Sequence, residues 1–337
     1  MRRPLRVGSS PTRRHVHGGS PQSLHRRRGD RAHGAVCDDL GEWPFLHRAR
    51  CGSRRRRALL RERGRTVTLH ASSSDSVELA IHDLGGEGPP LLFVHATGFH
   101  GRCYTRIAEQ LGDIRRCWAP DLRAHGDSTI PADDRFHWSG MADDLCAVLD
   151  ALGIDEPVDF VGHSMGGATV IATELRRPGT IRTAWLFEPI VFPPMGDNPS
   201  TMSDVARNRR ASFDTIEAVL ERYGSRPPFS AIDPAVLDDY VRHGFTPSPE
   251  GVTLKCTPES EARTFESVDY EVYGRLGGID ADITVIASTD GAPPATIAPM
   301  VADGIESARL VTWEGETHFG PFTHPARAAT EIRTNLR

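Results

Sequence analysis

From Thr66 onward, short apolar runs alternate with amphipathic segments, which predicts strands and helices in turn. Residues 66–72 and 77–84 alternate apolar and polar positions, and the polar stretch 73–76 between them predicts a turn joining two strands. Two continuous apolar runs, 90–96 and 158–164, are typical of strands covered on both faces. Further strands are expected at 116–122, 181–191, 281–288 and 308–313.

Helical spacing fills the intervals between these strands. In 138–153 the residues Met141, Leu145, Val148 and Leu149 share one face, and a glycine ends the segment. Other helices are expected at 106–111, 166–177, near 295–303 and from about 321. This alternation predicts an α/β fold with a mostly parallel sheet and helices on both faces.

One stretch, about 193–277, breaks the alternation between two strands. It contains helical pieces such as 233–244, in which Val236, Leu237, Tyr240 and Val241 share a face. We therefore expect a helical cap insertion over the carboxyl edge of the sheet, where open parallel sheets bind their ligands.

Charge divides the chain of 337 residues into two parts. Residues 1–65 carry a net charge of +13, almost entirely from arginine, and the remainder carries −18. Residues 1–64 lack apolar periodicity and are predicted to be a disordered Arg-rich extension without a role in the chemistry, while 65–337 form the folded domain. Nucleic-acid binding by this extension is an alternative, but no aromatic residues interleave with the arginines of 53–65, so no nucleic-acid partner is expected.

The six cysteines are scattered without metal-ligand or redox spacing. They are expected to be free thiols in a reducing compartment, and no apolar run has the length of a membrane span. These observations predict a cytoplasmic protein without a metal or membrane association, and they leave the oligomeric state open.

The motif Gly-His-Ser-Met-Gly-Gly at 162–167 supplies the candidate nucleophile, Ser164. It follows a predicted buried strand and precedes a predicted helix, with Gly162 and Gly166 two residues away on either side. A sharp strand-to-helix turn leaves no room for larger side chains at those positions, and the helix dipole that starts at Met165 favours a developing oxyanion. This context favours a catalytic serine over a serine that only shapes a turn.

Two further motifs precede the Ser164 motif along the chain. They are His-Ala-Thr-Gly-Phe-His at 95–100 and Asp-Leu-Arg-Ala-His-Gly-Asp-Ser at 121–128. Together the three motifs resemble the α/β-hydrolase superfamily over about residues 66–337, as a capped member with a serine nucleophile. The first resembles the family's loop after the third strand, with Ala96 where glycine is usual. The second resembles a turn of haloperoxidase-like and epoxide-hydrolase-like members, with Ala124 replacing glycine.

The resemblance implies roles for further residues. The backbone N–H groups of Thr97 and Met165 would form the oxyanion hole, and His318, in the loop after the last predicted strand, would be the base. The acid would be Asp290, which follows the strand 281–288, with Glu188 as the alternative at the end of the preceding strand. His95 is expected to structure its loop.

These residues predict a serine hydrolase that works through an acyl-enzyme without a cofactor. The expected partner is a small acyl substrate: a carboxylic ester, a thioester, a lactone or a carbon–carbon bond adjacent to a carbonyl. Two alternatives stay open: a cofactor-free haloperoxidase or perhydrolase, and a catalytically silent receptor or scaffold with the same fold.

Overall fold

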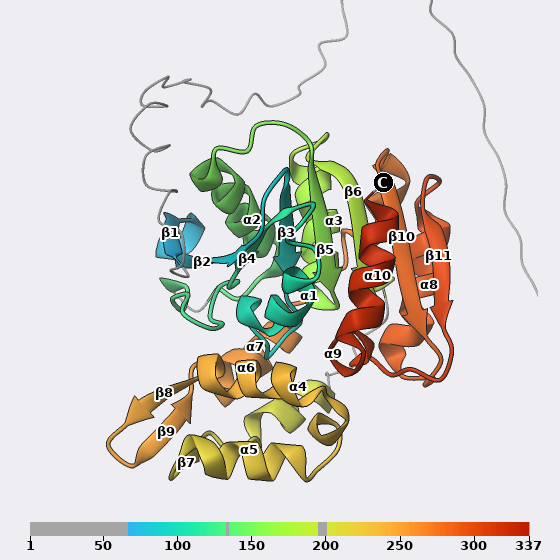
Figure 1. The fold of residues 1–337 in the computed structure, drawn as a ribbon. Coiled ribbons are helices and arrows are strands. Elements are labelled where there is room, and N and C mark those ends of the chain that lie inside the picture. Colours follow the sequence, from blue (N-terminus) through green and yellow to red (C-terminus); the bar gives the residue numbers. More distant parts are fainter. Residues whose placement is uncertain (1–66, 133–134, 195–200, 337) are drawn as a thin grey trace, which may run out of the picture. The chain divides into compact units, whose positions relative to one another are not determined.

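The computed structural model describes residues 67–132, 135–194 and 201–336 (Figure 1). The extension predicted at 1–64 therefore lies outside the described residues. Within the described ranges, no helix combines the length and the apolar character needed to cross a bilayer.

The centre of the fold is an eight-stranded sheet with the order β1-β2-β4-β3-β5-β6-β10-β11. The first two strands pair antiparallel with each other, β2 pairs antiparallel with β4, and the remaining pairs are parallel. The strands are β1 Thr68–Ser72, β2 Glu78–Gly85, β3 Pro90–Val94, β4 Arg116–Pro120, β5 Val158–His163, β6 Ile181–Phe187, β10 Asp282–Ser288 and β11 Arg309–Trp313.

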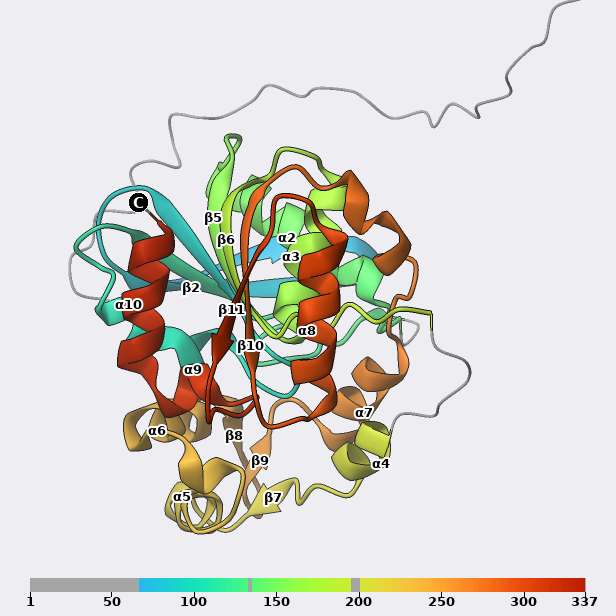
Figure 2. The same ribbon diagram turned by 90° about the vertical axis from the view of Figure 1, so that its right-hand side faces the viewer.

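Helices cover both faces of this sheet, as predicted (Figure 2). On one face lie α2, α3 and α8, and on the other lie α1 and α10. Their bounds are α1 Thr105–Glu109, α2 Trp138–Leu152, α3 Met165–Arg176, α8 Pro293–Gly304, α9 Gly320–Thr323 and α10 Pro325–Asn335. Short 3-10 helices occupy Ser74–Ser76, Gly101–Tyr104, Phe229–Ala231 and Tyr273–Gly278.

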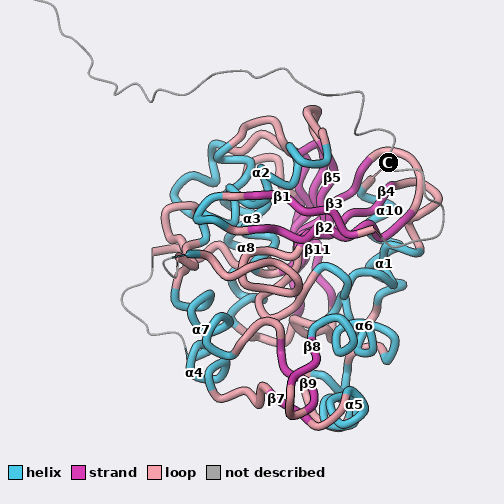
Figure 3. Tube along the Cα trace, turned by 90° about the vertical axis from the view of Figure 1, so that its left-hand side faces the viewer, coloured by secondary structure: helices cyan, strands magenta, loops and turns pink. Residues whose placement is uncertain are grey.

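The segment between β6 and β10, here called the cap, contains helices and a small antiparallel sheet of order β7-β9-β8 (Figure 3). Its elements are α4 Thr201–Arg207, β7 Ser212–Phe213, α5 Ile216–Gly224, α6 Pro234–Gly244, β8 Phe245–Ser248, β9 Gly251–Leu254 and α7 Pro258–Glu266. The expectation of a purely helical cap is thus incomplete. The strands of this sheet have two to four residues, too few for an alternating pattern to stand out in the sequence.

One difference in strand length bears directly on the site. The apolar run 181–191 predicted a single strand, but β6 ends at Phe187 because Glu188 adopts a left-handed backbone conformation with φ 45°. Glu188 is nevertheless fully buried. The chain therefore turns at a buried carboxylate, which places that side chain at the carboxyl edge of the sheet.

Candidate active site

Ser164 occupies a strained turn between β5 and α3. Its backbone has φ 55° and ψ −117°, a combination that non-glycine residues rarely adopt, and such strain concentrates at functional sites. A Cβ atom at Gly166 would lie 2.0 Å from the carbonyl oxygen of Val94, and one at Gly162 would lie 2.7 Å from the Cα of Gly167. The glycines around Ser164 are therefore required by close backbone contacts.

The turn is held by backbone hydrogen bonds on both sides of the serine. The Ser164 N–H donates to the carbonyl of Phe187 at 2.9 Å. The Ser164 carbonyl accepts from the N–H groups of Ala168 and Ile190, at 3.1 and 3.3 Å. Two of these contacts come from Phe187 at the end of β6 and from Ile190 just after it. The turn of the chain at Glu188 therefore also fixes the backbone of Ser164.

His318 is paired with Glu188 across the neighbouring strand β10. Its Nδ1 lies 2.5 Å from Glu188 Oε2, and the carboxylate is fully buried while the imidazole side chain is 23 % exposed. The other carboxylate oxygen, Oε1, accepts the backbone N–H of Ser288 at 2.7 Å. Both oxygens of Glu188 are thus engaged, so the carboxylate is held in one orientation against the ring of His318.

Asp290 occupies a different position from the one expected of the acid. It is exposed, and its Oδ1 accepts the N–H of Ala292 at 2.9 Å. An aspartate that bonds to the backbone two residues further along the chain forms an Asx-turn. Its only contact with the base is to the backbone N–H of His318, at 3.4 Å. In the structure Glu188, and not the preferred candidate Asp290, reaches Nδ1 of His318, while Asp290 forms a turn of its own. Glu188 is therefore the candidate acid that the geometry favours.

Beside Ser164, His163 supports the loop that carries His318, a contact that sequence reasoning missed. Its Nε2 donates to the carbonyl of His318 at 2.9 Å, and Tyr104 Oη lies 3.2 Å from its Nδ1. Burial lowers the pKa of His163 well below its usual value, so the ring is neutral and carries its proton on Nε2. In the sequence, only the position of His163 next to Ser164 could have indicated this contact, and His163 was interpreted as part of the turn motif.

The two ring nitrogens of His318 have different surroundings. Nδ1 is bonded to Glu188, and the carbonyl of the same residue accepts from His163. Contacts between a catalytic serine and its base are often long before substrate binds. With Nδ1 facing Glu188, Nε2 is the nitrogen that remains for proton transfer.

Thr97 and Met165, the two expected oxyanion donors, lie against each other: Thr97 Oγ1 is 3.3 Å from Met165 Sδ. Met165 is the first residue of α3, where the backbone N–H has no partner within the helix. The Ala96 carbonyl accepts from His95 Nδ1 at 2.9 Å and from the Phe99 N–H at 3.1 Å. Because a trans peptide directs its N–H opposite its carbonyl, these bonds also fix the direction of the Thr97 N–H.

His95 structures this loop, as expected. Its Nε2 accepts the backbone N–H of Leu122 at 2.9 Å, which leaves the proton on Nδ1 for the carbonyl of Ala96. Burial lowers the pKa of His95 to about 3, so the ring stays neutral. His95 is committed to two backbone groups and has no free nitrogen to act as a base.

Aromatic rings from three segments meet beside these loops. Phe99 lies two residues after Thr97, Phe319 directly follows His318, and Phe229 belongs to the cap. The ring centroids lie 6.0 Å apart for Phe99 and Phe319, and 6.1 Å apart for Phe229 and each of the other two. These three rings form an apolar cluster where the loop after β3, the loop after β11 and the cap meet.

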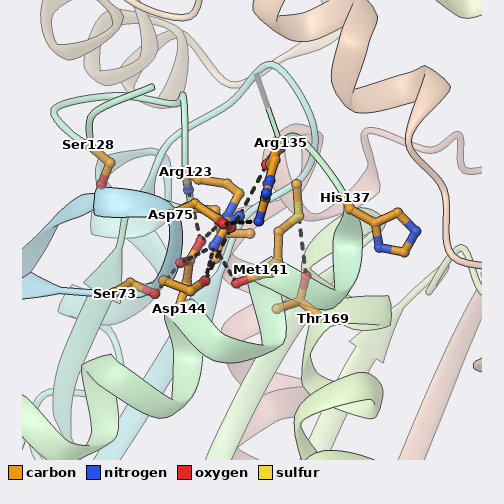
Figure 4. Close-up of polar contacts among 12 residues, drawn as sticks. Ser73, Asp75, Arg123, Ser128, Arg135, His137, Met141, Asp144 and Thr169 are labelled. Atoms are coloured by element: carbon orange, nitrogen blue, oxygen red, sulfur yellow. Dashed lines mark hydrogen bonds and ion pairs between the residues drawn. The ribbon is translucent and has the colours of Figure 1, made fainter. Parts of the chain in front are cut away.

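Two polar clusters outside this site brace the loop 121–128. Asp121 accepts hydrogen bonds from the backbone N–H groups of Gly101 and Asp127 and from the His82 ring, all within 2.8 Å. His82, Asp121 and Asp127 are close enough to hold a metal ion, but both oxygens of Asp121 are already used in these hydrogen bonds. Arg123 is fully buried and pairs with the fully buried Asp144 at 2.8 Å (Figure 4). It also donates to Asp75 and to the Gly140 carbonyl, and it faces a surface groove of about 350 Å³. The contacts of these clusters are those of structural braces.

The fold and the arrangement of Ser164, His318 and Glu188 define the class of α/β hydrolases. The model of the alpha/beta hydrolase family matches residues 91–331, and the chain belongs to this family. It is 32 % identical over 179 residues to lipase LipV of Mycobacterium tuberculosis, covering 52 % of this chain and 65 % of that protein. It is 34 % identical over 105 residues to 2-hydroxymuconate semialdehyde hydrolase of a Pseudomonas species, covering 30 % and 36 %. The matched regions thus span less than two thirds of these curated relatives.

Solved structures show the same fold at lower sequence identity. A crystal structure of E-2-(acetamidomethylene)succinate hydrolase superposes with a TM-score of 0.66 at 18 % identity, covering 81 % of this chain and 99 % of the other. A thermophilic esterase from Thermogutta terrifontis gives a TM-score of 0.62 at 22 % identity, covering 80 % and 98 %. The curated relatives include lipases and a semialdehyde hydrolase, which supports a hydrolase.

Proposed function

We propose that the protein is a serine hydrolase that cleaves a small acyl substrate through a covalent Ser164 ester. The observation that carries this proposal is the Glu188–His318 pair at 2.5 Å beside a serine in a strained strand-to-helix turn. A buried carboxylate on Nδ1 holds the imidazole in the tautomer whose Nε2 can accept a proton. This is the arrangement that activates a serine hydroxyl at neutral pH.

The reaction would proceed in two halves. Ser164 Oγ attacks the substrate carbonyl carbon while its proton moves to His318 Nε2, and the negative oxygen is stabilised by the N–H groups of Thr97 and Met165. The bond to the leaving group breaks as that group takes the proton from His318. Water then attacks the acyl-enzyme, giving its proton to His318, and Ser164 recovers a proton as the acid product leaves.

The substrate proposed is a carboxylic ester, a thioester, a lactone or a compound with a carbon–carbon bond next to a carbonyl. Lipases and a semialdehyde hydrolase are among the relatives, which supports acyl chemistry of this kind. The rings of Phe99, Phe229 and Phe319 favour a substrate whose acyl or leaving group is apolar, because apolar groups gain free energy by contact with apolar surface.

Labelling with a fluorophosphonate probe tests the mechanism. The wild type should gain one adduct on Ser164 in intact-protein mass spectrometry, and Ser164→Ala should gain none. Ser225→Ala, at an exposed residue of the cap, is the matched control and should label like the wild type. Equal labelling of the wild type and Ser164→Ala would refute the proposal.

A further inference from the structure

Tyr240, in helix α6 of the cap, contacts three consecutive residues of the loop that follows β3. Its hydroxyl donates to the carbonyl of Gly98 at 3.3 Å, and His100 Nε2 donates to the Tyr240 carbonyl at 3.1 Å. Its ring packs on Phe99, with centroids 5.0 Å apart, and stacks on His100 with an interplanar angle of 8°. A single buried residue of the cap thus joins both ends of the segment 98–100.

An ion pair within the cap fixes the hydroxyl of Tyr240. Arg209 Nη2 donates to Tyr240 Oη at 2.8 Å, and Arg209 Nη1 is bonded to Glu261 on α7. Because the oxygen of Tyr240 accepts from Arg209, its own proton is left to donate to Gly98. Burial raises the pKa of Tyr240, so the hydroxyl keeps this proton at neutral pH.

Gly98 lies directly against this ion pair. Its φ is 77°, and a Cβ atom there would lie 2.6 Å from Glu261 Oε1 and 3.2 Å from Arg209 Nη1. The cap therefore touches the backbone of the loop itself, at the residue that follows Thr97. Movement of the cap away from the sheet would break the Tyr240 contacts to Gly98 and His100.

We propose that Tyr240 is a positioning residue that ties the cap to the oxyanion loop and so holds the Thr97 N–H in place for the reaction. This inference rests on the proposed function. The Phe99 N–H closes the turn 96–99 by bonding to the Ala96 carbonyl, and that bond sets the direction of the Thr97 N–H. Restraining Gly98 and His100 restrains this turn, so the oxyanion hole is complete only while the cap is docked.

The test compares Tyr240→Phe with Tyr223→Phe. Tyr223 Oη is also within reach of Arg209, at 3.5 Å, and its hydroxyl makes no contact with the loop 95–100, so it is the matched control. On a small activated ester, Tyr240→Phe should lower kcat about tenfold with KM within about twofold, since misplacing a catalytic donor acts on the transition state. The rate of fluorophosphonate inactivation should fall by the same factor, and Tyr223→Phe should match the wild type in both.

Hydrogen exchange gives a readout that does not depend on activity. In Tyr240→Phe, backbone amides of 95–104 should exchange faster than in the wild type and in Tyr223→Phe. A wild type that neither labels nor hydrolyses esters would refute the proposed function, while the exchange measurement would still test the tie.

Two results would overturn the inference. One is a Tyr240→Phe protein that is folded and active with the kcat of Tyr223→Phe, and the other is unchanged exchange in 95–104. If Tyr240→Phe does not fold, Arg209→Lys replaces it. Lysine keeps a charge for Glu261, but its single nitrogen cannot take the place of both Nη1, which binds Glu261, and Nη2, which binds Tyr240. That variant should show the same fall in kcat at unchanged KM, and an unchanged kcat would overturn the inference equally.

Discussion

Replacing Glu188 by glutamine should nearly abolish turnover without disturbing the packing of the site. In the wild type, Oε1 accepts the Ser288 N–H and Oε2 faces Nδ1 of His318. The glutamine oxygen would keep the bond to Ser288, because a buried N–H left without an acceptor costs about 1–3 kcal/mol. The glutamine NH2 group would then face Nδ1.

This orientation of the amide favours the other tautomer of the His318 imidazole. An amide NH2 donates, so Nδ1 would become the acceptor and the proton would move to Nε2, where it blocks transfer from Ser164. In this variant the His318 ring would also lack a carboxylate that stabilises its protonated form. Both effects act on kcat, and we expect a loss of about 10⁴-fold, the loss seen when the acid of a serine-protease triad is made neutral.

The matched control is Asp290→Asn, which changes a carboxylate on the same loop system by the same single atom. Its oxygen can still accept from Ala292, and its contact with the backbone of His318 is long at 3.4 Å. We expect its kcat to stay within about threefold of the wild type, since surface hydrogen bonds of this kind are weak. The assay is steady-state hydrolysis of one activated ester, with folding of each variant checked by circular dichroism.

The reverse outcome would refute this reasoning. If Asp290→Asn is the nearly inactive variant and Glu188→Gln retains turnover, then the acid acts from the loop after β10, and the contact between Glu188 and His318 is structural only.

Three further predictions concern stability. Arg123→Met should lower the free energy of unfolding in urea by about 3–5 kcal/mol because it leaves a buried carboxylate unpaired, whereas Arg176→Ala, which removes a half-exposed ion pair, should cost at most about 1 kcal/mol; equal losses would contradict the brace. Gly166→Ala should cost about 3 kcal/mol or more, since its methyl group would overlap a backbone carbonyl, and Gly274→Ala, with open space around it, should cost under about 0.5 kcal/mol in the same assay. Burial lowers the pKa of His95 to about 3. Below about pH 6.5 this histidine therefore binds a proton in the unfolded chain but stays neutral in the folded protein. The free energy of unfolding should therefore be flat above about pH 7.5 and fall toward pH 4 by about 1.4 kcal/mol per pH unit for each such histidine, with a smaller slope in His95→Gln; an unchanged slope in that variant would contradict the assignment.

Local patterns in the sequence were sufficient to predict the sheet, its helices and the position of Ser164. Strand β5 coincides with a continuous apolar run, and helix α3 follows it directly. The glycines at 162 and 166 mark the turn between them, because close backbone contacts there leave no room for a side chain. His318, in the loop after β11, was indicated by the resemblance to the α/β hydrolases, whose histidine follows the nucleophile and the acid along the chain. Whether these residues act as proposed is the subject of the labelling test.

The acid could not be chosen from the sequence because the choice depends on how far a side chain reaches across a sheet. The run 181–191 stays apolar after Glu188, so nothing in the pattern marks the turn at that residue. Asp290 lies closer to His318 in strand order, but its carboxylate is occupied by a turn of its own. Glutamate has one more methylene than aspartate, and from β6 it spans β10 to reach Nδ1.

Tyr240 in the cap is a residue for which the sequence indicates the need for a hydrogen-bond partner but not the identity of that partner. Val236, Leu237, Tyr240 and Val241 share the predicted apolar face of 233–244, and all four are buried. Tyr240 alone among them has a polar group, and a buried hydroxyl must find hydrogen-bond partners. That argument predicts that Tyr240 has such partners. It does not say that they are Arg209 and Gly98, because these residues are distant in sequence and meet Tyr240 only when the cap packs on the loop after β3. Among the described residues of α6, Tyr240 is therefore the one whose substitution should separate catalysis from folding. Phenylalanine keeps the packing of the ring and removes the hydroxyl, with its bond to Gly98 and the bond that it accepts from Arg209.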